Sequence, residues 1–339
     1  AESGGTTSSV GAILDRGSFM ISRVKNKIHA LLFWQSRVGE VLNKIYDMWI
    51  FYRHSFYIGF ASRENYEAWL TKQYHIVEKG LAMPDPRKNF GAEKIRLLIK
   101  VSEEYIAKYG PSELLRTISS ALRAYLNANT GLSAANPELH ALIERFISSI
   151  GANKNGGTKL VSPTVFPEFD RFARSRSSIR AFNDNEVDNA LVAKAVDTAK
   201  YAPSVCNRQG WKVHLYADKE RISTMLSLQD GNGGFGQTIK KLLIVTADSR
   251  CFTNLESNQL FVDGGLFSMN LLLSLHSMGV GSCCLNLCVP YTREKQIKNV
   301  GGIGEYERPI MMIGIGHYDA QTRVAISWRK DSNEILQLH

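Results

Sequence analysis

The sequence predicts an all-helical N-terminal half followed by an α+β domain, and three observations support this division. The chain of 339 residues is long enough for about two domains. Apolar residues recur at spacings of three and four through residues 20–150, as they do on one side of an amphipathic helix. After a run of Gly and Asn at 151–158, helical patterns alternate with short apolar segments that are typical of strands.

Helix follows helix in the prediction for the N-terminal half. The longest apolar stripe runs from Ile28 to Tyr52. The same periodicity predicts further helices over residues 63–81, 92–109, 111–127 and 137–150. Pro111 and Pro137 suit the first turn of the last two helices, where a backbone N–H has no intrahelical partner. No segment before residue 160 is predicted to be a strand.

The α+β domain is predicted from alternating patterns. Helices are expected over residues 189–201 and 263–278, and strands over residues 211–216, 241–247 and 309–316. The second of these strands is almost continuously apolar, which is typical of a central strand. We therefore expect a helical domain at 20–150, a linker at 151–165 and the α+β domain at 166–339. Residues 1–19 are interpreted as a tail or a cloning remnant.

Charge and cysteine content exclude several classes of protein. The formal net charge is +9, and residues 1–160 carry most of the excess, with 21 basic against 14 acidic residues. No RNA-binding module pattern accompanies it, so no nucleic-acid partner is expected. No run of about 18 apolar residues predicts a membrane-spanning helix. The five cysteines include no paired CxxC motifs, so no metal site is expected, and they suggest reduced thiols of a cytoplasmic protein.

The first candidate site is Arg174-Ser-Arg-Ser-Ser-Ile-Arg-Ala-Phe182, in which three arginines and three hydroxyls lie close together. A guanidinium offers a planar fork of donors to a phosphate, and serine hydroxyls add short hydrogen bonds. The alternative is a solvated basic helix start anchored by Phe182. The pattern therefore indicates a phosphate site as a hypothesis.

The second candidate site is residues 202–211, Ala-Pro-Ser-Val-Cys-Asn-Arg-Gln-Gly-Trp, between a predicted helix and a predicted strand. Pro203 should end the helix and leave Ser204, Asn207 and Gln209 on a loop. Amide side chains donate and accept hydrogen bonds at once, which suits the edge of a heterocycle. Taken alone, the segment could equally be an ordinary turn.

Together these two segments, followed by an apolar helix that ends in Met-Gly-Val-Gly-Ser, resemble the nitroreductase family of FMN-dependent oxidoreductases. The resemblance spans residues 168–339, with a helical extension before it. One departure is Gly210, where the family usually has Pro. The resemblance implies a sandwich with a central antiparallel-rich sheet flanked by helices, and a homodimer with FMN at the subunit interface.

The resemblance also implies roles for individual residues. Arg176, Ser178 and Arg180 match the segment that holds the FMN phosphate, the ribityl chain and the flavin pyrimidine edge, with Ser177 between them. Late in the chain, Arg329 matches a basic residue on the phosphate, with Lys330 as the less favoured neighbour.

The remaining matches concern the flavin ring. The loop that reaches the flavin, often from the partner subunit, is matched by Pro203, Ser204, Asn207 and Gln209. Asn232 falls near a flavin-contacting Asn. Asn286 and Leu287 fall where backbone amides approach flavin N5.

The resemblance implies chemistry on the flavin rather than on a protein nucleophile. NAD(P)H would reduce FMN, and a small nitroaromatic- or quinone-like acceptor would then take the electrons at the same face. No G-x-G-x-x-G motif lies between a predicted strand and a helix, and residues 231–236, which match it superficially, precede a strand, so a separate nicotinamide-binding domain is not expected. Two alternatives stay open: a flavin enzyme of another reaction, such as dehalogenation or flavin cleavage, and a non-catalytic scaffold at a membrane surface.

Two features of the N-terminal half remain. His75 and Glu78 would share one helix face and could contact substrate, but a capped helix end with Gly80 and Lys79 is the favoured interpretation. The aromatic run from Leu31 to Phe60, with interleaved basic residues, could lie peripherally on an anionic membrane, pack on the FMN domain or form the dimer interface. Packing is the commoner fate of such a stripe.

Overall fold

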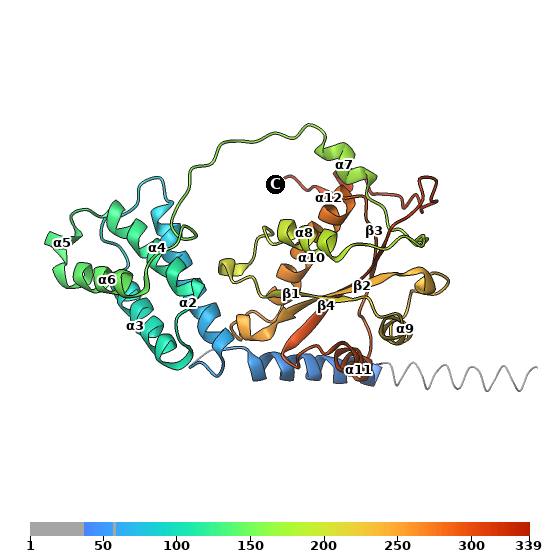
Figure 1. Ribbon diagram of the computed structural model, residues 1–339, viewed down its shortest axis with the longest axis horizontal. Helices are drawn as coiled ribbons and strands as arrows, with labels where there is room; N and C mark the ends of the chain where they lie inside the picture. Colours follow the sequence, from blue (N-terminus) through green and yellow to red (C-terminus); the bar gives the residue numbers. More distant parts are fainter. Residues whose placement is uncertain (1–36, 57–58) are drawn as a thin grey trace, which may run out of the picture.

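The computed structural model describes residues 37–56 and 59–339. Figure 1 shows a helical part beside a part built around a sheet, with an extended segment looping between them. The predictions for residues 1–19, and for the beginning of the stripe that starts at Ile28, lie outside the described residues. Among the described helices, none combines the length and apolarity needed to cross a membrane.

The helical part confirms the periodic pattern of the sequence. Its helices are α2 (Arg63–Leu81), α3 (Ala92–Tyr109), α4 (Glu113–Ala128), α5 (Leu132–Ala135) and α6 (Pro137–Ile150). Asn136 caps α6 by accepting from Leu139 N–H, and Pro137 occupies the first turn as predicted. The prediction for Pro111 was wrong, because α4 begins after the N-cap Ser112.

Residues 37–54 also form a helix, but it packs on the sheet-containing part. Phe51 joins a cluster with Ala247, Phe252 and Leu260. Asn43 Oδ1 accepts from Tyr291 N–H at 2.7 Å. The sequence prediction grouped this helix with the helices that follow it, because periodicity reports an apolar face and not the surface it contacts.

The sheet is antiparallel throughout, which confirms the α+β prediction. Its strands are β1 (Trp211–Tyr216), β2 (Lys241–Asp248), β3 (Gly281–Leu285) and β4 (Glu307–Gly316), in the order β1-β2-β4-β3. β2 is buried along its whole length, as expected of a central strand. β3 was not predicted, because Gly-Ser-Cys-Cys-Leu is short and offers no clear alternation.

Helices cover both faces of the sheet (Figure 1). The α+β helices are α7 (Phe169–Ser175), α8 (Asn189–Ala199), α9 (Lys219–Ser227), α10 (Gln259–Ser277), α11 (Tyr291–Gly301) and α12 (Ser332–Ile335). Leu243 and Val245 point into the core shared with α8 and α10. Leu242 and Ile244 point into the core shared with α9 and α11. This alternation is the period-2 geometry of a strand covered on both sides.

The predicted linker has two structurally different halves. Residues 151–158 pack on the helical part, where Gly157 N–H donates to Glu78 Oε1 at 2.9 Å. A Cβ at Gly156 would lie 2.2 Å from the Thr117 carbonyl oxygen. Residues 159–166 are exposed and form neither helix nor strand, with Leu160 and Val165 among the exposed apolar side chains. The division of the chain at 151–165 stays a prediction.

Candidate functional site

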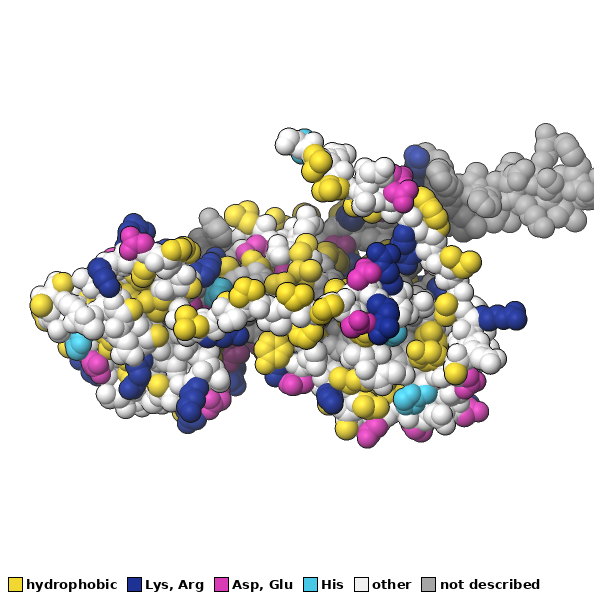
Figure 2. Space-filling model, turned by 90° about the horizontal axis from the view of Figure 1, so that it is seen from above, with side chains coloured by type: hydrophobic (Ala, Val, Ile, Leu, Met, Phe, Trp, Pro, Cys, Tyr) yellow, Lys and Arg dark blue, Asp and Glu magenta, His cyan; other side chains and the backbone are white. Residues whose placement is uncertain are grey.

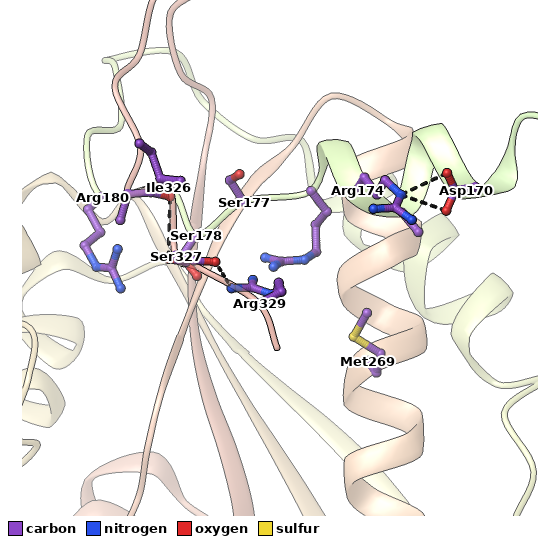
Figure 3. A pocket seen from close by; sticks show the side chains of 12 residues that line it. Asp170, Arg174, Ser177, Ser178, Arg180, Met269, Ile326, Ser327 and Arg329 are labelled. Atoms are coloured by element: carbon purple, nitrogen blue, oxygen red, sulfur yellow. Dashed lines mark hydrogen bonds and ion pairs between the residues drawn. The ribbon is translucent and has the colours of Figure 1, made fainter. Parts of the chain in front are cut away.

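A cavity of about 620 Å³ gathers one group of predicted cofactor-binding residues. Its walls include the side chains of Arg176, Ser177, Ser178, Arg180 and Arg329. Figure 3 shows Ser177, Ser178, Arg180 and Arg329 around the same space, although Arg329 comes from the far end of the chain. Arg174, the first residue of the predicted phosphate segment, also lines the cavity. Sequence reasoning missed other lining residues, which are Asp170, Ala173, Met269, Ala325, Ile326 and Ser327.

Local structure fixes the 176–180 segment along the edge of the sheet. Arg176 is the C-cap of α7 in an extended conformation. Ser178 forms an isolated parallel bridge with Ser282 of β3, and Ile179 N–H donates to the Ser282 carbonyl at 3.0 Å. Because an extended segment alternates its side chains, Ile179 enters the core while its neighbours face the cavity.

The cavity is strongly cationic. Arg174 pairs with Asp170, with Nε 2.8 Å from a carboxylate oxygen. Within the described residues, Arg176, Arg180 and Arg329 form no ion pair, so the lining carries a formal excess of three positive charges. Figure 2 looks down on this side of the molecule and shows Lys and Arg side chains gathered around a hollow. Such a surface attracts an anion.

A Ser–His hydrogen bond borders this cationic region. Ser175 Oγ lies 2.7 Å from His276 Nε2, at the last turn of α10. Burial, together with the positive charge of Arg176, lowers the pKa of His276. A neutral imidazole adds no further positive charge at neutral pH. No sequence pattern indicated this contact, because the two residues lie far apart in the chain.

Predicted flavin residues also meet beyond the end of β3. Asn232 Nδ2 donates to Gln229 Oε1 at 3.0 Å, and Gln229 Nε2 donates to the Asn286 carbonyl at 3.1 Å. Gln229 is buried and was missed in the sequence. Leu287 packs against the neighbouring core. Four residues of strand, about 13 Å, separate Ser282 beside the cavity from Asn286.

The loop with Pro203, Ser204, Asn207 and Gln209 lies elsewhere and does not line the 620 Å³ cavity. Its backbone is constrained: Cys206, Asn207 and Gln209 all have positive φ, at 50°, 55° and 51°. Ser204 Oγ accepts from Gln209 N–H at 3.1 Å. Positive φ angles at residues other than glycine are strained, and such strain is often found at functional sites.

The helical part contacts this loop through α2. A side-chain hydrogen bond joins Tyr74 to Asn207, and burial raises the pKa of Tyr74 to about 12. At Gly210, where the family usually has Pro, a Cβ would lie 2.9 Å from the Phe252 ring. The loop is therefore held between α2 and the 249–252 segment.

His75 and Glu78 do meet, but outside the cavity. His75 Nδ1 lies 3.1 Å from Glu78 Oε2, and the other oxygen of Glu78 accepts from Gly157 N–H. These contacts tie α2 to residues 151–158. The favoured helix-cap interpretation was wrong in one respect: α2 ends at Leu81 with Ala82 as its C-cap, and Gly80 instead makes room for Phe90. A role in substrate binding stays a prediction.

Comparisons with known proteins find similarity to nitroreductases over part of the chain. Residues 173–248 match the model of the nitroreductase family. A "Putative NADH dehydrogenase/NAD(P)H nitroreductase" of Methanothermobacter thermautotrophicus is 27% identical over 149 residues, which is 42% of this chain and 74% of that protein. A 4-nitrobenzoate reductase of Pseudomonas putida is 32% identical over 63 residues, 18% of this chain and 28% of that protein.

Solved structures with a similar fold include two from bacteria. A nitroreductase family protein from Streptococcus pneumoniae has a TM-score of 0.44 and 22% identity, covering 50% of this chain and 100% of that chain. A putative nitroreductase in complex with FMN, from Desulfovibrio desulfuricans, has a TM-score of 0.45 and 22% identity. The match covers 52% of this chain and 98% of that chain.

The cationic cavity lies in the α+β part of the chain, which contains the residues matched by the family model. The family match over residues 173–248 and the curated NAD(P)H nitroreductase relatives support an FMN-dependent oxidoreductase of nitroreductase type. Within the described residues, no group of three or more His, Cys, Asp or Glu side chains could hold a metal ion.

Proposed function

We propose that the protein uses NAD(P)H and FMN to reduce a small organic acceptor, of nitroaromatic- or quinone-like character. The observation that carries the proposal is the cationic cavity lined by Arg176, Arg180 and Arg329. Its volume of about 620 Å³ falls in the range of roughly 300–1,000 Å³ that is common for small-molecule sites.

The charge of the cavity fits FMN. The phosphate group carries up to two negative charges and the reduced flavin ring one more, against an excess of three positive charges on the lining. The hydroxyls of Ser177 and Ser178 make no hydrogen bond to another described side chain, so they are available to a ligand. Bound FMN would supply the redox chemistry, as an acceptor and donor of hydride.

Different residues of the chain are assigned to different parts of the bound FMN. We assign Arg176 and Arg329 to the phosphate, where paired guanidinium groups bind most strongly. Arg180 would hold a positive charge beside the pyrimidine edge and stabilise negative charge there. The backbone at Asn286 and Leu287, fixed by Gln229, would face flavin N5. No general acid or nucleophile of the protein is needed.

A homodimer could form an FMN site that includes both the cavity and the Ser204–Gln209 loop, whereas one copy could not. The Ser204–Gln209 loop and the 620 Å³ cavity are separate in one chain, so one FMN could contact both only if a second copy supplies the loop. α10 exposes apolar side chains, namely Phe261, Val262, Leu266 and Met269. Met269 also lines the cavity. These observations favour a dimer in which the FMN lies at the interface.

The cysteines favour a reducing compartment, which we propose to be the cytoplasm. All five cysteines of the chain are free thiols in the structure. Disulfides are rare in reducing compartments and common in secreted proteins of comparable cysteine content.

The colour of the purified protein tests the proposal. We expect a yellow protein that releases FMN on denaturation, is bleached by NADH or NADPH without oxygen, and regains its colour when a nitroaromatic or a quinone is added. A protein that stays colourless after incubation with FMN would overturn the proposal. Bleaching without recovery by either acceptor class would overturn the assigned acceptor but keep the flavin.

A further inference from the structure

The helix of residues 37–54 carries apolar side chains on two sides. Its inner side is buried on the sheet-containing part through Tyr46, Ile50 and Phe51. Its outer side carries an apolar ridge, defined here as Val38, Val41, Leu42, Ile45, Met48, Trp49 and Tyr52. Each ridge residue is between 44% and 59% exposed. A helix that is apolar on most of its circumference is normally buried in the complete assembly.

The spacing within the ridge fits another helix. Val38, Val41, Ile45, Met48 and Tyr52 are separated by three, four, three and four residues. This is the a/d seam along which two helices pack knobs into holes over two heptads. Leu42 and Trp49 flank the seam one turn after Val38 and Ile45. The ridge therefore presents a narrow, self-complementary stripe rather than scattered apolar residues.

A groove continues from the ridge toward α10. Met48 and Tyr52 line a cavity of about 310 Å³ together with Phe261, which is exposed near the beginning of α10. The Arg308 guanidinium lies 5.7 Å from the centroid of the Phe261 ring. The cavity thus joins the ridge to the α10 surface, and its lining also includes Lys44 and the Asp47–Arg308 ion pair. Figure 1 shows this helix lying along the sheet-containing part.

The exposed area of the ridge is large enough for a second copy of the chain to pack against it. The ridge exposes roughly 700 Å² of side chain, close to the roughly 800 Å² that each partner buries in a standard protein interface. With the exposed residues of α10 included, it exceeds that value. A membrane fits less well, because residues 37–54 hold three Lys or Arg and two Asp or Glu, whereas membrane-surface helices are rich in basic residues.

From these observations we infer that the ridge of one copy packs against the ridge of a second copy, forming a helix–helix seam outside the family's own domain. The seam places residues 37–54 of both copies side by side and continues the apolar surface of α10. It adds to the dimer a contact that the FMN site does not require, so FMN uptake and the seam can be tested separately.

Photo-crosslinking tests the seam directly. p-Benzoylphenylalanine is incorporated at Ile45, and the protein is mixed with a ¹⁵N-labelled copy before irradiation. We expect adducts between copies that map to residues 37–54 of the second copy. The matched control is the same group at Leu97, which is 47% exposed on α3 and lies outside the ridge. Adducts confined to one copy, including residues 1–36 of that copy, would overturn the inference.

A charge substitution provides a second measurement. Ile45→Asp should weaken self-association at least tenfold in sedimentation, while Leu97→Asp leaves it unchanged. Both residues are exposed in the single chain, so neither change should prevent folding. Equal association of Ile45→Asp and the unchanged protein would overturn the seam. The inference would also be overturned by a combination of two results. The protein would bind phosphatidylcholine–phosphatidylglycerol vesicles in a way that Ile45→Asp abolishes, and no crosslink between copies would form.

Discussion

Arg176 and Arg329 line the same cavity, although they lie at opposite ends of the α+β part of the chain. Arg176 is held at the end of α7, where the chain turns to run beside β3. Arg329 comes from the C-terminal segment, and its guanidinium donates to the Ser327 carbonyl oxygen. The folded chain therefore brings two cations together that no local sequence pattern connects.

Removing either cation should release FMN. Arg176→Ala and Arg329→Ala each remove charge-assisted hydrogen bonds of about 1.5–3 kcal/mol, so FMN affinity should fall roughly 10- to 100-fold. The absorbance of bound flavin after gel filtration measures the loss. Arg171→Ala is the control, because Arg171 lies on α7 but pairs with Glu168 and does not line the cavity. Full flavin absorbance in either cavity variant would contradict the phosphate assignment.

Arg180 should affect the redox potential more than FMN retention. Its positive charge is assigned beside the ring, where negative charge accumulates on reduction. Arg180→Gln should therefore lower the midpoint potential of bound FMN, by about 30 mV if the lost stabilisation is about 1.4 kcal/mol. A redox titration against dyes of known potential measures this, with Arg180→Lys as the charge-preserving control. An unchanged potential in Arg180→Gln would place this residue away from the ring.

Glu307 should make stability depend on acid pH. Burial alone would raise its pKa, but hydrogen bonds from His214 and Thr246, with the charge of Lys212, lower the pKa from 4.5 to about 2. His214 Nε2 lies 2.7 Å from Glu307 Oε2. A carboxyl with a depressed folded pKa stabilises the fold above its unfolded pKa and loses that contribution as pH falls through the folded one.

The stabilising contribution of Glu307 is therefore lost as the pH falls from about 4.5 to about 2. The free energy of unfolding should fall by up to about 3 kcal/mol across it. Urea titrations at a series of pH values measure this loss. Glu307→Gln should flatten the dependence, whereas Glu305→Gln, at an exposed neighbour, should retain it. A Glu307→Gln variant with the original pH slope would show that other groups dominate.

The sequence predicted those parts of the fold and site that local patterns encode. α3 and α6 match their predicted bounds because amphipathic spacing and capping residues are local. β3 was missed because five small or apolar residues become a strand only by pairing with β4. In the site, a sequence motif predicted Arg176 and Arg180, whereas no motif pointed to Gln229. Its role is visible only once it joins Asn232 to Asn286.

The last prediction concerns residues 151–158, whose composition suggested a flexible linker. In the structure Gly156 lies against α4, where a Cβ would come within 2.2 Å of the Thr117 carbonyl oxygen. That contact is with backbone, which cannot rotate away as a side chain can. Gly156→Ala should therefore lower the free energy of unfolding by about 1–3 kcal/mol, the usual effect of overpacking.

Urea unfolding and hydrogen exchange measure this effect together. Gly156→Ala should also speed exchange at Gly157, whose N–H donates to Glu78. Asn155→Ala is the matched control, because Asn155 is exposed and its only hydrogen bond to a described residue uses its backbone N–H, which Ala retains. If both variants unfold like the unchanged protein, the run acts as the flexible linker that its composition suggests. A loss in Gly156→Ala alone would instead make these residues part of the helical fold, and any flexible connection would begin at residue 159.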